Sequence, residues 1–384
     1  MKASLAGWFF LLPILMPIFA AENTTFEDMP ALSLANDRLE LKVLPRGSAI
    51  ASIVLRDDPN KLNPLWDPIR MARELGRKNT FGGGTGHFLC LDGFGPVSPE
   101  EKAAGLPGHG EAHLQQWEVR AQSKEGGTST LTLATRLPIT QENLTRTMRV
   151  VDGENVVYVE TELESLLGFD RPICWGEHAT IGSPFLEPGV TVVDLSAKRA
   201  QTRPYEAEKG GLPHRLPPGK DFDWPMAPTV GGGQVDLRAA PANPDSIDHS
   251  TSLMDTSREL EFVSALNPGR RLVLGYVFKR AEYPWTQNWE NYPATLKMAR
   301  GMEFSTQPYD VPRREVVDEN RMFGVPLYRW LPAKSKIGTR FLMFYAHVPD
   351  GFKKVDDVRL ENGILIIEDR KANLRVRLKA SLPL

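Results

Sequence analysis

Apolar residues that alternate with polar ones recur along almost the whole chain, and this period of two most constrains the fold. Leu39, Leu41 and Val43 alternate with Glu and Lys, and after the turn at 45–47 the pattern resumes over residues 49–55. In a strand, successive side chains point to opposite faces of the sheet. The two segments therefore predict a β-hairpin with one buried face.

The same pattern predicts further strands through to the end of the chain. They lie at residues 131–137, 157–163, 272–278, 358–366 and 374–378. The segment 358–366 contains Asn362-Gly363, the dipeptide that a two-residue hairpin turn favours. An antiparallel sheet is therefore predicted from one end of the chain to the other.

Signals for helices are sparse. The best one starts at Asp67-Pro68, a capping residue followed by proline at the first helical position, and stops at Gly76. Predicted strands do not alternate with predicted helices, so the pattern does not favour a parallel α/β sheet. The 32 Gly and 31 Pro among 384 residues fit a protein with many turns. We predict an all-β fold, a large antiparallel β-supersandwich with a few short helices.

The longest irregular stretch runs from Pro204 to Gly233 and contains six Pro and six Gly residues. It could link two domains. However, alternating strands of the same type lie on both sides, and long ordered loops on a β-scaffold often carry binding sites. We therefore predict a single domain over residues 22–384.

The first 21 residues resemble a secretory signal. Lys2 precedes an uncharged stretch that ends in Ala20 and Ala21, the small residues expected at a cleavage site. The 19 uncharged residues from Ala3 to Ala21 could alternatively form an uncleaved membrane anchor. We predict cleavage and export to the periplasm or the medium, with no integral membrane segment afterwards.

Composition and charge exclude several classes of function. With 46 Lys and Arg against 48 Asp and Glu, the net charge is −2, and no basic excess attracts nucleic acid. The triple glycines at 82–84 and 231–233 lack the Lys-Ser/Thr of a phosphate-binding loop. Cys90 and Cys174 are the only cysteines, so a disulfide between them is possible but cannot be derived from the sequence.

A metal site and a cofactor are not predicted. His109 and His113 are spaced like metal ligands, but the string is HGEAH rather than HExxH, and Gly110 argues against a rigid helix there. Histidines, carboxylates and tryptophans remain at turns and strand ends. They include His178, Glu303, and the pair Trp285 and Trp289 with Glu290 beside it. Alone, a loop histidine is more often a solvated or turn-bonded residue than a catalyst, and a glutamate in a strand usually lies on the solvated face. The two tryptophans fit core packing equally well.

Together, in their order, these segments resemble the galactose mutarotase (aldose 1-epimerase) family. The resemblance begins at LSLANDRLELKVLPRGSAIASIVLRD and continues with FGGGTGHFLCLDGFGP and HGEAHLQQW. It extends through LTRTMRVVDGENVVYVETELES and CWGEH to the segment around Glu303, and covers about residues 31–347. Glu177 precedes His178 where the family has Asn, and residues 90–94 replace an arginine-containing loop. The chain thus resembles a divergent branch.

The resemblance implies a sugar mutarotase or epimerase, an isomerase that acts at the anomeric carbon of a small sugar or glycan by general acid–base catalysis. Glu303 would be the base, His178 the acid and His109 a hydrogen-bonding group. Sugar-binding residues would be Trp285, Trp289, Glu290, Asp248, His113 and Trp175. The sugar itself and the oligomeric state are not predicted.

Two other functions stay open. A carbohydrate-binding module without catalysis could keep the sandwich and the tryptophans without the acid–base pair. The β-domain of a polysaccharide lyase has a similar sandwich, but it needs a large helical partner domain, and no helical region of that size is present. Because fold likeness alone cannot separate these functions, the test is whether His109, His178 and Glu303 converge.

Overall fold

The computed structural model describes residues 23–78, 84–204 and 211–384. The predicted signal segment Met1–Ala21 lies outside these residues. Within the described part of the chain, no helix combines the length and apolarity that crossing a membrane requires.

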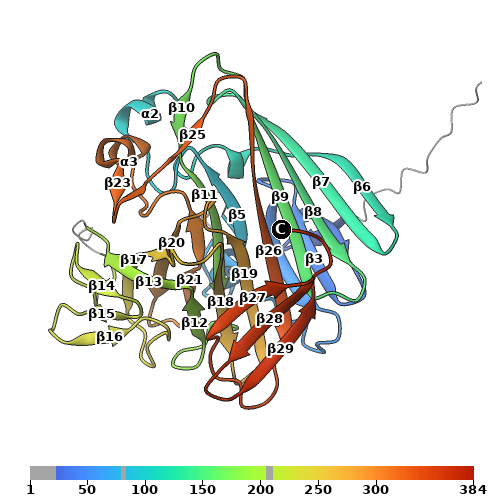
Figure 1. Cartoon of the computed structure of the whole chain (residues 1–384), viewed down its shortest axis with the longest axis vertical. Helices are drawn as coiled ribbons and strands as arrows, with labels where there is room; N and C mark the ends of the chain where they lie inside the picture. The colour runs from blue at the N-terminus through green and yellow to red at the C-terminus, as the bar shows by residue number, and fades with distance from the viewer. Residues whose placement is uncertain (1–22, 79–83, 205–210) are drawn as a thin grey trace, which may run out of the picture.

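Two large antiparallel sheets make up most of the molecule (Figure 1). The first has twelve strands: β1 (Asn23–Phe26), β2 (Met29–Ala35), β3 (Leu39–Leu44), β4 (Ala49–Leu55), β5 (His87–Leu91), β11 (Trp175–Gly182), β21 (Ala299–Gly301), β22 (Glu303–Ser305), β20 (Trp285–Tyr292), β17 (Ser246–Met254), β13 (Ala197–Thr202) and β14 (Asp221–Asp223). Both β21 and β22 bridge β11 and β20.

The second large sheet has eight strands, and a smaller one packs on its outer side. The eight are β12 (Val192–Leu195), β18 (Leu260–Asn267), β19 (Leu272–Lys279), β26 (Lys336–His347), β9 (Val156–Ser165), β8 (Glu142–Val151), β7 (Thr128–Leu137) and β6 (Glu118–Glu125). The smaller sheet contains β27 (Asp357–Glu361), β28 (Ile364–Asp369) and β29 (Leu374–Lys379), drawn in red in Figure 1.

Short elements complete the described fold. Two-stranded pairs are β10 (Arg171–Ile173) with β25 (Arg329–Leu331), β15 (Met226–Pro228) with β16 (Gln234–Asp236), and β23 (Arg321–Met322) with β24 (Val325–Pro326). The helices are α1 (Pro68–Glu74), α2 (Pro99–Ala103), α3 (Arg313–Glu319) and the 3-10 turn η1 (Ala112–Leu114). The all-β, antiparallel supersandwich predicted from the sequence is confirmed.

The alternation of residues in the central strands explains how three layers are held together. In β19, Leu274 and Tyr276 face the core between the two large sheets, whereas Val273 and Val277 face the small sheet. Both faces of β19 are therefore buried, and each fully buried large apolar side chain contributes about 1.5–3 kcal/mol. The predicted strand at 272–278 is confirmed, with its second face also apolar.

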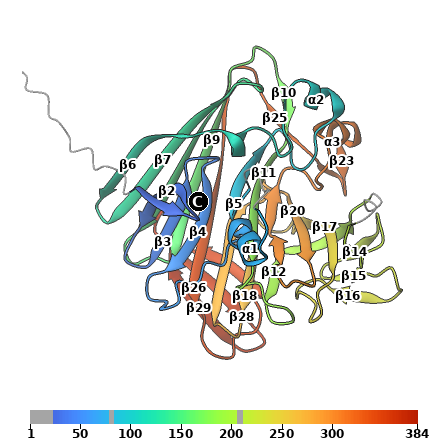
Figure 2. The ribbon, with the colours of Figure 1, turned by 180° about the vertical axis from the view of Figure 1, so that it is seen from behind.

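The local predictions for hairpins and the first helix are also confirmed. Strands β3 and β4 pair, and β27 and β28 turn at Asn362 and Gly363, whose φ angles are +50° and +74°. Helix α1 begins after Asp67, whose side chain accepts the backbone N–H of Arg70. Seen from behind, α1 lies against the twelve-stranded sheet (Figure 2), where Met71 packs on Trp66 and Ala299.

The stretch from Pro204 to Gly233 folds against the large sheet in the part that the structure describes. Strand β14 pairs with β13 at the edge of the twelve-stranded sheet. Leu216, Phe222 and Ala227 then form a small buried cluster with Ala200 of β13. The single domain over residues 22–384 stays a prediction.

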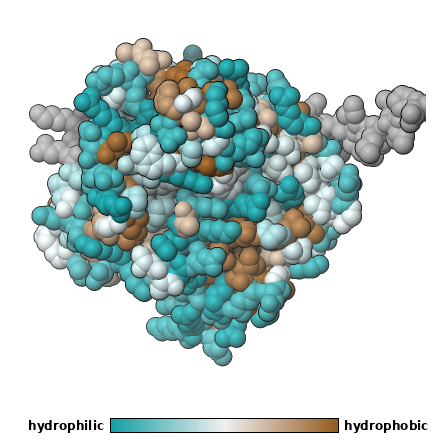
Figure 3. All heavy atoms as spheres, turned by 45° about the horizontal axis from the view of Figure 1, so that its top comes forward, coloured by the Kyte–Doolittle hydropathy of each residue, from teal (hydrophilic) through white to brown (hydrophobic). Residues whose placement is uncertain are grey.

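The surface is mainly hydrophilic when its upper end is turned forward (Figure 3). Hydrophobic residues there form separate patches rather than one continuous face. Scattered exposed apolar side chains are normal for a soluble domain, so these patches alone mark no binding site.

Candidate active site

Strand β11 separates two environments because neighbouring residues point to opposite faces of the sheet. The Glu177 side chain points between the two large sheets, where it contacts Arg146 of β8. His178 consequently points to the outer face of the twelve-stranded sheet. On that face lies a cavity of about 620 Å³, lined by Trp66, Gly84, Phe88, Phe94, Gly95, Pro96, Gly108, His109, His113, Leu114, His178, His249, Trp289, Glu303 and Asp310.

His178 and Glu303 meet in this cavity. Their Nε2 and Oε1 atoms are 3.3 Å apart, and both side chains are nearly buried. This contact is not aligned as a hydrogen bond, so Glu303 Oε1 has no hydrogen-bond donor among the described residues. The other ring nitrogen of His178 lies 2.9 Å from Thr180 Oγ1, which fixes the orientation of the imidazole.

Burial disfavours a charge on either member of the pair. It raises the pKa of Glu303 well above its ordinary value, and the carboxylate of Asp310 raises it further. It lowers the pKa of His178 well below its ordinary value, and the neighbouring His109 adds to this. Burial therefore favours the uncharged carboxyl group and the uncharged imidazole in the free protein.

Gly301 makes room for the Glu303 carboxyl group. A Cβ atom at position 301 would lie 2.4 Å from Glu303 Oε1, a distance that real Cβ contacts essentially never reach. Any side chain there would push the carboxyl group from its place beside His178. The sequence Gly301-Met302-Glu303 thus matters for the position of Glu303 as well as for the strand.

The ring of His109 lies 6.1 Å from the ring of Phe94, and its backbone has an unusual conformation. Its φ of +63° is in the left-handed region, which non-glycine residues rarely adopt and which recurs at functional sites. Its Nδ1 accepts the backbone N–H of Gly95 at 3.1 Å, and the thiol of Cys90 lies 3.5 Å away. Because Nδ1 is an acceptor, neutral His109 carries its proton on Nε2 and is a donor.

The remaining walls are aromatic, with His113, the third predicted histidine, among them. Phe88 stacks on His178 with ring centroids 4.3 Å apart, and His113 lies 5.6 Å from the same ring. Trp289 and Trp66 meet edge to face at 5.7 Å. An apolar pocket with a few convergent polar groups is the usual form of a small-molecule site.

Two predicted sugar-binding carboxylates, Asp248 and Glu290, do not line the cavity. They are cross-strand neighbours on β17 and β20, and both form ion pairs with Arg215. The pair next to them in register is His249 with Trp289, which does line the cavity. A shift of one residue along a strand reverses the face, so Asp248 and Glu290 point away from the cavity.

Two predicted tryptophans also lie elsewhere. Trp175 is on the same face of β11 as Glu177 and packs in the core between the large sheets. Trp285 is fully buried with Phe323 nearby, and its indole N–H donates to the carbonyl of Pro326. The structure therefore brings together His109, His113, His178, Glu303 and Trp289 from the predicted set.

The sequence reading missed several residues of the cavity. Trp66 precedes α1, Phe88 is in β5, and Asp310 follows β22 at some distance in the chain. His249 directly follows Asp248, which was predicted to bind sugar; it has the opposite parity in the same strand, and of the two residues it is His249 that lines the cavity. Nothing in the local sequence distinguishes Trp66 or Asp310 from other loop residues.

The charge of the cavity is neutral to negative. Among the described residues that line it, none is Lys or Arg, while Glu303 and Asp310 are acidic. No group of three His, Cys, Asp or Glu residues in the described ranges is arranged to hold a metal ion. Cys90 and Cys174 are both buried and not bridged to each other.

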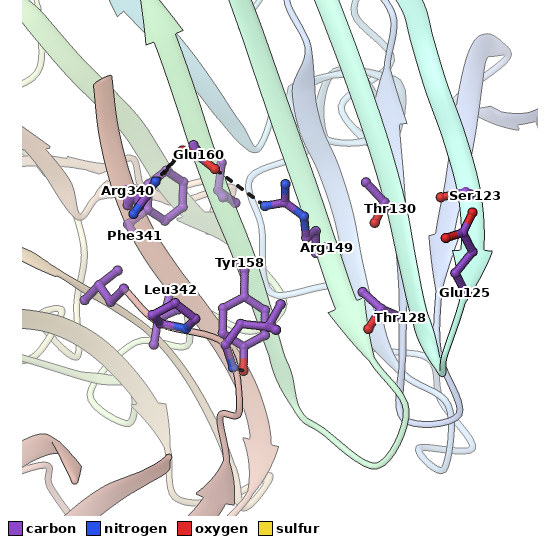
Figure 4. Close-up of a pocket in the computed structure, with 14 residues that line it drawn as sticks. Ser123, Glu125, Thr128, Thr130, Arg149, Tyr158, Glu160, Arg340, Phe341 and Leu342 are labelled. Atoms are coloured by element: carbon purple, nitrogen blue, oxygen red, sulfur yellow. Dashed lines mark hydrogen bonds and ion pairs between the residues drawn. The ribbon is translucent and has the colours of Figure 1, made fainter. Parts of the chain in front are cut away.

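A second hollow differs from this cavity in its chemistry. It lies on the outer face of the eight-stranded sheet, where Arg149 and Arg340 both contact Glu160 beside Tyr158 and Leu342 (Figure 4). Arg340 and Glu160 are well exposed, at 48% and 38% of their side-chain surface. No histidine lines this hollow, so it offers none of the acid–base chemistry found beside Glu303.

Comparison with known proteins places this cavity in a recognised fold. No family model matches the sequence, and no curated protein matches it. Among solved structures, the Slr1438 protein of Synechocystis is 15% identical, with 85% of this chain and 99% of that chain covered and a TM-score of 0.58. A galactose mutarotase-like protein from Clostridium acetobutylicum is 11% identical over 85% of this chain and 98% of its own, with a TM-score of 0.57.

A third structure agrees with these two. The galactose mutarotase related enzyme from Lactobacillus acidophilus is 12% identical, with 86% of this chain and all of its own covered and a TM-score of 0.55. The chain therefore has the galactose mutarotase-like fold. The resemblance stated from the sequence is confirmed at the level of the fold, at an identity that fits a divergent branch.

Proposed function

We propose that this protein is a sugar mutarotase of the aldose 1-epimerase type, an isomerase that interconverts the anomers of a free sugar. The observation that carries the proposal is the contact of His178 Nε2 with Glu303 Oε1 at 3.3 Å, inside a cavity that His109 also lines. A carboxyl and an imidazole with opposite pKa shifts are the acid and base that ring opening requires.

The reaction needs one proton removed and one supplied. Glu303 takes the proton of the anomeric hydroxyl group as the bond from C1 to the ring oxygen breaks, and His178 gives a proton to that ring oxygen. The open-chain aldehyde rotates about C1–C2 and closes by the reverse transfers. Each such acid or base contributes about 10²–10⁴-fold.

The pair carries one proton throughout. In the free protein, burial favours this proton on Glu303. Its transfer to His178 gives the carboxylate base and the imidazolium acid, and the oxygens of a bound sugar stabilise both by hydrogen bonds. His109 donates from Nε2 to a third sugar oxygen, because its Nδ1 already accepts the N–H of Gly95.

The lining of the cavity defines the class of sugar. A phosphate or a carboxylate on the ring would find no Lys or Arg among the described lining residues, and Asp310 would repel it. The substrate in this proposal is an uncharged aldose, with its C–H surface against Trp289. We also propose that the protein is exported, and N-terminal sequencing of protein from its native host would then give a start near Ala21 or Glu22.

Polarimetry tests the proposed activity. Pure α-anomers of a panel of hexoses and pentoses are mixed with the protein, and the uncatalysed rate of mutarotation is subtracted. We expect acceleration with at least one neutral sugar and none with its 6-phosphate. If no sugar of the panel is accelerated but calorimetry detects sugar binding, the protein is a carbohydrate-binding module, which the aromatic lining of Trp66 and Trp289 would also serve.

A further inference from the structure

A second imidazole–carboxyl pair lines the same cavity, apart from His178 and Glu303. His249 of β17 and Asp310 meet there, with Nδ1 of the imidazole 2.9 Å from Oδ1 of the carboxylate. The His249 residue is only 7% exposed. The mechanism above uses neither residue, so the role of this pair has to be derived separately.

The partners of the pair determine which atom faces the sugar. Arg203 lies 3.3 Å from Asp310 Oδ2 and so favours the ionised carboxylate. A carboxylate only accepts hydrogen bonds, so at 2.9 Å from Asp310 a neutral His249 carries its proton on Nδ1. Its other nitrogen, Nε2, then carries a lone pair. That buried atom has no hydrogen-bond partner among the described residues.

The register of the sheet gives the distance from the reacting groups. Glu303 of β22 is paired with Gln287 of β20, and His249 of β17 is paired with Trp289 two residues further along β20. His249 is therefore two strands away from Glu303 and two residues further along, about 12 Å between backbones at the usual strand spacing and rise. A pyranose ring that reaches Glu303 with C1 can reach His249 with a hydroxyl group on its far side.

His249 and His109 have opposite hydrogen-bonding senses. Nδ1 of His109 accepts the N–H of Gly95, so its Nε2 is a donor. Nδ1 of a neutral His249 carries its proton beside Asp310, so its Nε2 is an acceptor. A sugar hydroxyl group can accept a hydrogen bond from His109 or donate one to His249. A group that cannot donate can pair with His109 but not with His249.

We propose that His249 Nε2 accepts a hydrogen bond from one sugar hydroxyl group remote from the anomeric carbon, with Asp310 as the positioning residue that fixes this tautomer. The pair thereby selects the configuration of the sugar at that carbon. This inference rests on the proposed function, since it needs a sugar in the cavity. It assigns specificity to two residues that take no part in the proton transfers.

Monodeoxy and deoxyfluoro sugars test the inference. Both series are made from the best neutral substrate of the panel, with one hydroxyl group replaced at a time. Fluorine can accept weakly but cannot donate, so at one position the two replacements should be equally harmful. We expect kcat/KM of the wild type to fall there about tenfold, because Nε2 is left buried and unpaired.

The variant His249→Phe should abolish this discrimination. The KM for the parent sugar should rise, kcat should change less, and the two analogues should react as well as the parent. His347→Gln is the matched control, since that histidine is 46% exposed on β26 and lines no part of the cavity. If His249→Phe keeps the sensitivity of the wild type to the two analogues, the inference is overturned.

Asp310→Asn tests the positioning role through a readout that a loss of packing would not change. An asparagine can donate to Nδ1, which lets His249 carry its proton on Nε2. The deoxyfluoro sugar should then recover relative to the deoxy sugar. Full activity of the wild type on every deoxyfluoro sugar would overturn the acceptor assignment and leave the proposed function intact. If no sugar is turned over, the proposed function fails, and calorimetric affinities of the same analogues decide about His249.

Discussion

Two neighbouring residues of β11, Glu177 and His178, point to opposite faces of the strand and have different surroundings. The carboxylate of Glu177 has a partner on each oxygen, and we call this the finished network. The carboxyl group of Glu303 beside His178 has an oxygen without a partner among the described residues, and we call this the unfinished face.

The Glu177 carboxylate accepts from Arg146 at 3.2 and 3.0 Å, and lies 2.8 Å from His87. The hydroxyl group of Tyr283 adds a contact at 3.3 Å. Each carboxylate oxygen therefore has partners, as a buried charge requires.

His178, one residue further on, is left incomplete. Its Nδ1 contacts Thr180, its Nε2 lies beside the misaligned Glu303, and one oxygen of that carboxyl group has no donor among the described residues. Both faces bury a carboxyl group, and unpaired atoms occur on both, since His87 Nδ1 and Arg146 Nε have no hydrogen-bond partner among the described residues. Only the face with a cavity leaves such atoms where a ligand can reach them. Burial alone therefore does not identify the site, whereas unmet hydrogen bonds beside a cavity do.

Removal of a partner from the finished network should have the largest effect. Arg146→Met leaves the buried Glu177 charge without its main partner, so the free energy of unfolding should fall by about 3–5 kcal/mol. Arg149→Met is the control on the same strand, since that arginine is 36% exposed and should cost less than about 1 kcal/mol. Urea denaturation measures both. Equal losses of unfolding free energy in the two variants would show that the buried contact of Arg146 with Glu177 stabilises the protein no more than an exposed ion pair does.

A substitution of Glu303, on the unfinished face, should lower the activity rather than the stability. Glu303→Gln keeps the shape but removes the base, so kcat should fall at least about 10²-fold, equivalent to about 2.7 kcal/mol. KM should change little, because a base acts mainly in the transition state. The polarimetric assay measures this, with Glu160→Gln on the outer sheet as the control. An unchanged rate would remove Glu303 from the mechanism.

A third effect concerns pH and the cavity histidines. Burial, together with His109 and Arg46, lowers the pKa of His113 to about 3. The unfolded chain takes up this proton near pH 6.5 but the folded protein does not, so stability is lost as the pH falls below about 6.5. The variant His113→Phe has no imidazole at this position, so its unfolded chain does not take up this proton.

The variant should therefore gain on the wild type by about 1.4 kcal/mol per pH unit below 6.5. Urea denaturation at pH 7.5, 6.5 and 5.5 checks this, and other groups cancel in the difference. The exposed His347 serves as the comparison, through His347→Phe. A difference between His113→Phe and wild type that stays constant with pH would mean that His113 is not buried as a neutral ring.

Local patterns in the sequence predicted the elements well. The hairpin of β3 and β4 and the helix after Asp67 follow from alternation and capping, which are local properties. Helix α2 was missed although Ser98-Pro99-Glu100-Glu101 contains a capping box, with Ser98 and Glu101 each accepting the other's backbone N–H. The edge-to-edge order of the strands needs contacts between distant segments, which one sequence does not contain.

The site was predictable only where a resemblance supplied the order of motifs. Trp285 and Trp289 have the same parity in β20, yet only Trp289 reaches the cavity, because the segment around Phe323 and Pro326 covers Trp285. That cover is a tertiary contact without a local signal. The meeting of His249 with Asp310 is likewise visible only in the fold.

The smallest effect is expected in the outer hollow, which shares with Glu177 only the presence of an arginine–carboxylate pair. Arg340→Ala removes the contact with Glu160, but both side chains are well exposed, so water replaces the lost partner. The free energy of unfolding should change by less than about 1 kcal/mol. The rate of mutarotation should match the wild type, because none of the described residues of this hollow lines the cavity beside Glu303. Denaturation and polarimetry on the same sample check both statements. A loss of activity with unchanged stability would mean that the outer sheet face takes part in the function, and the contrast between the two faces of the molecule would then no longer hold.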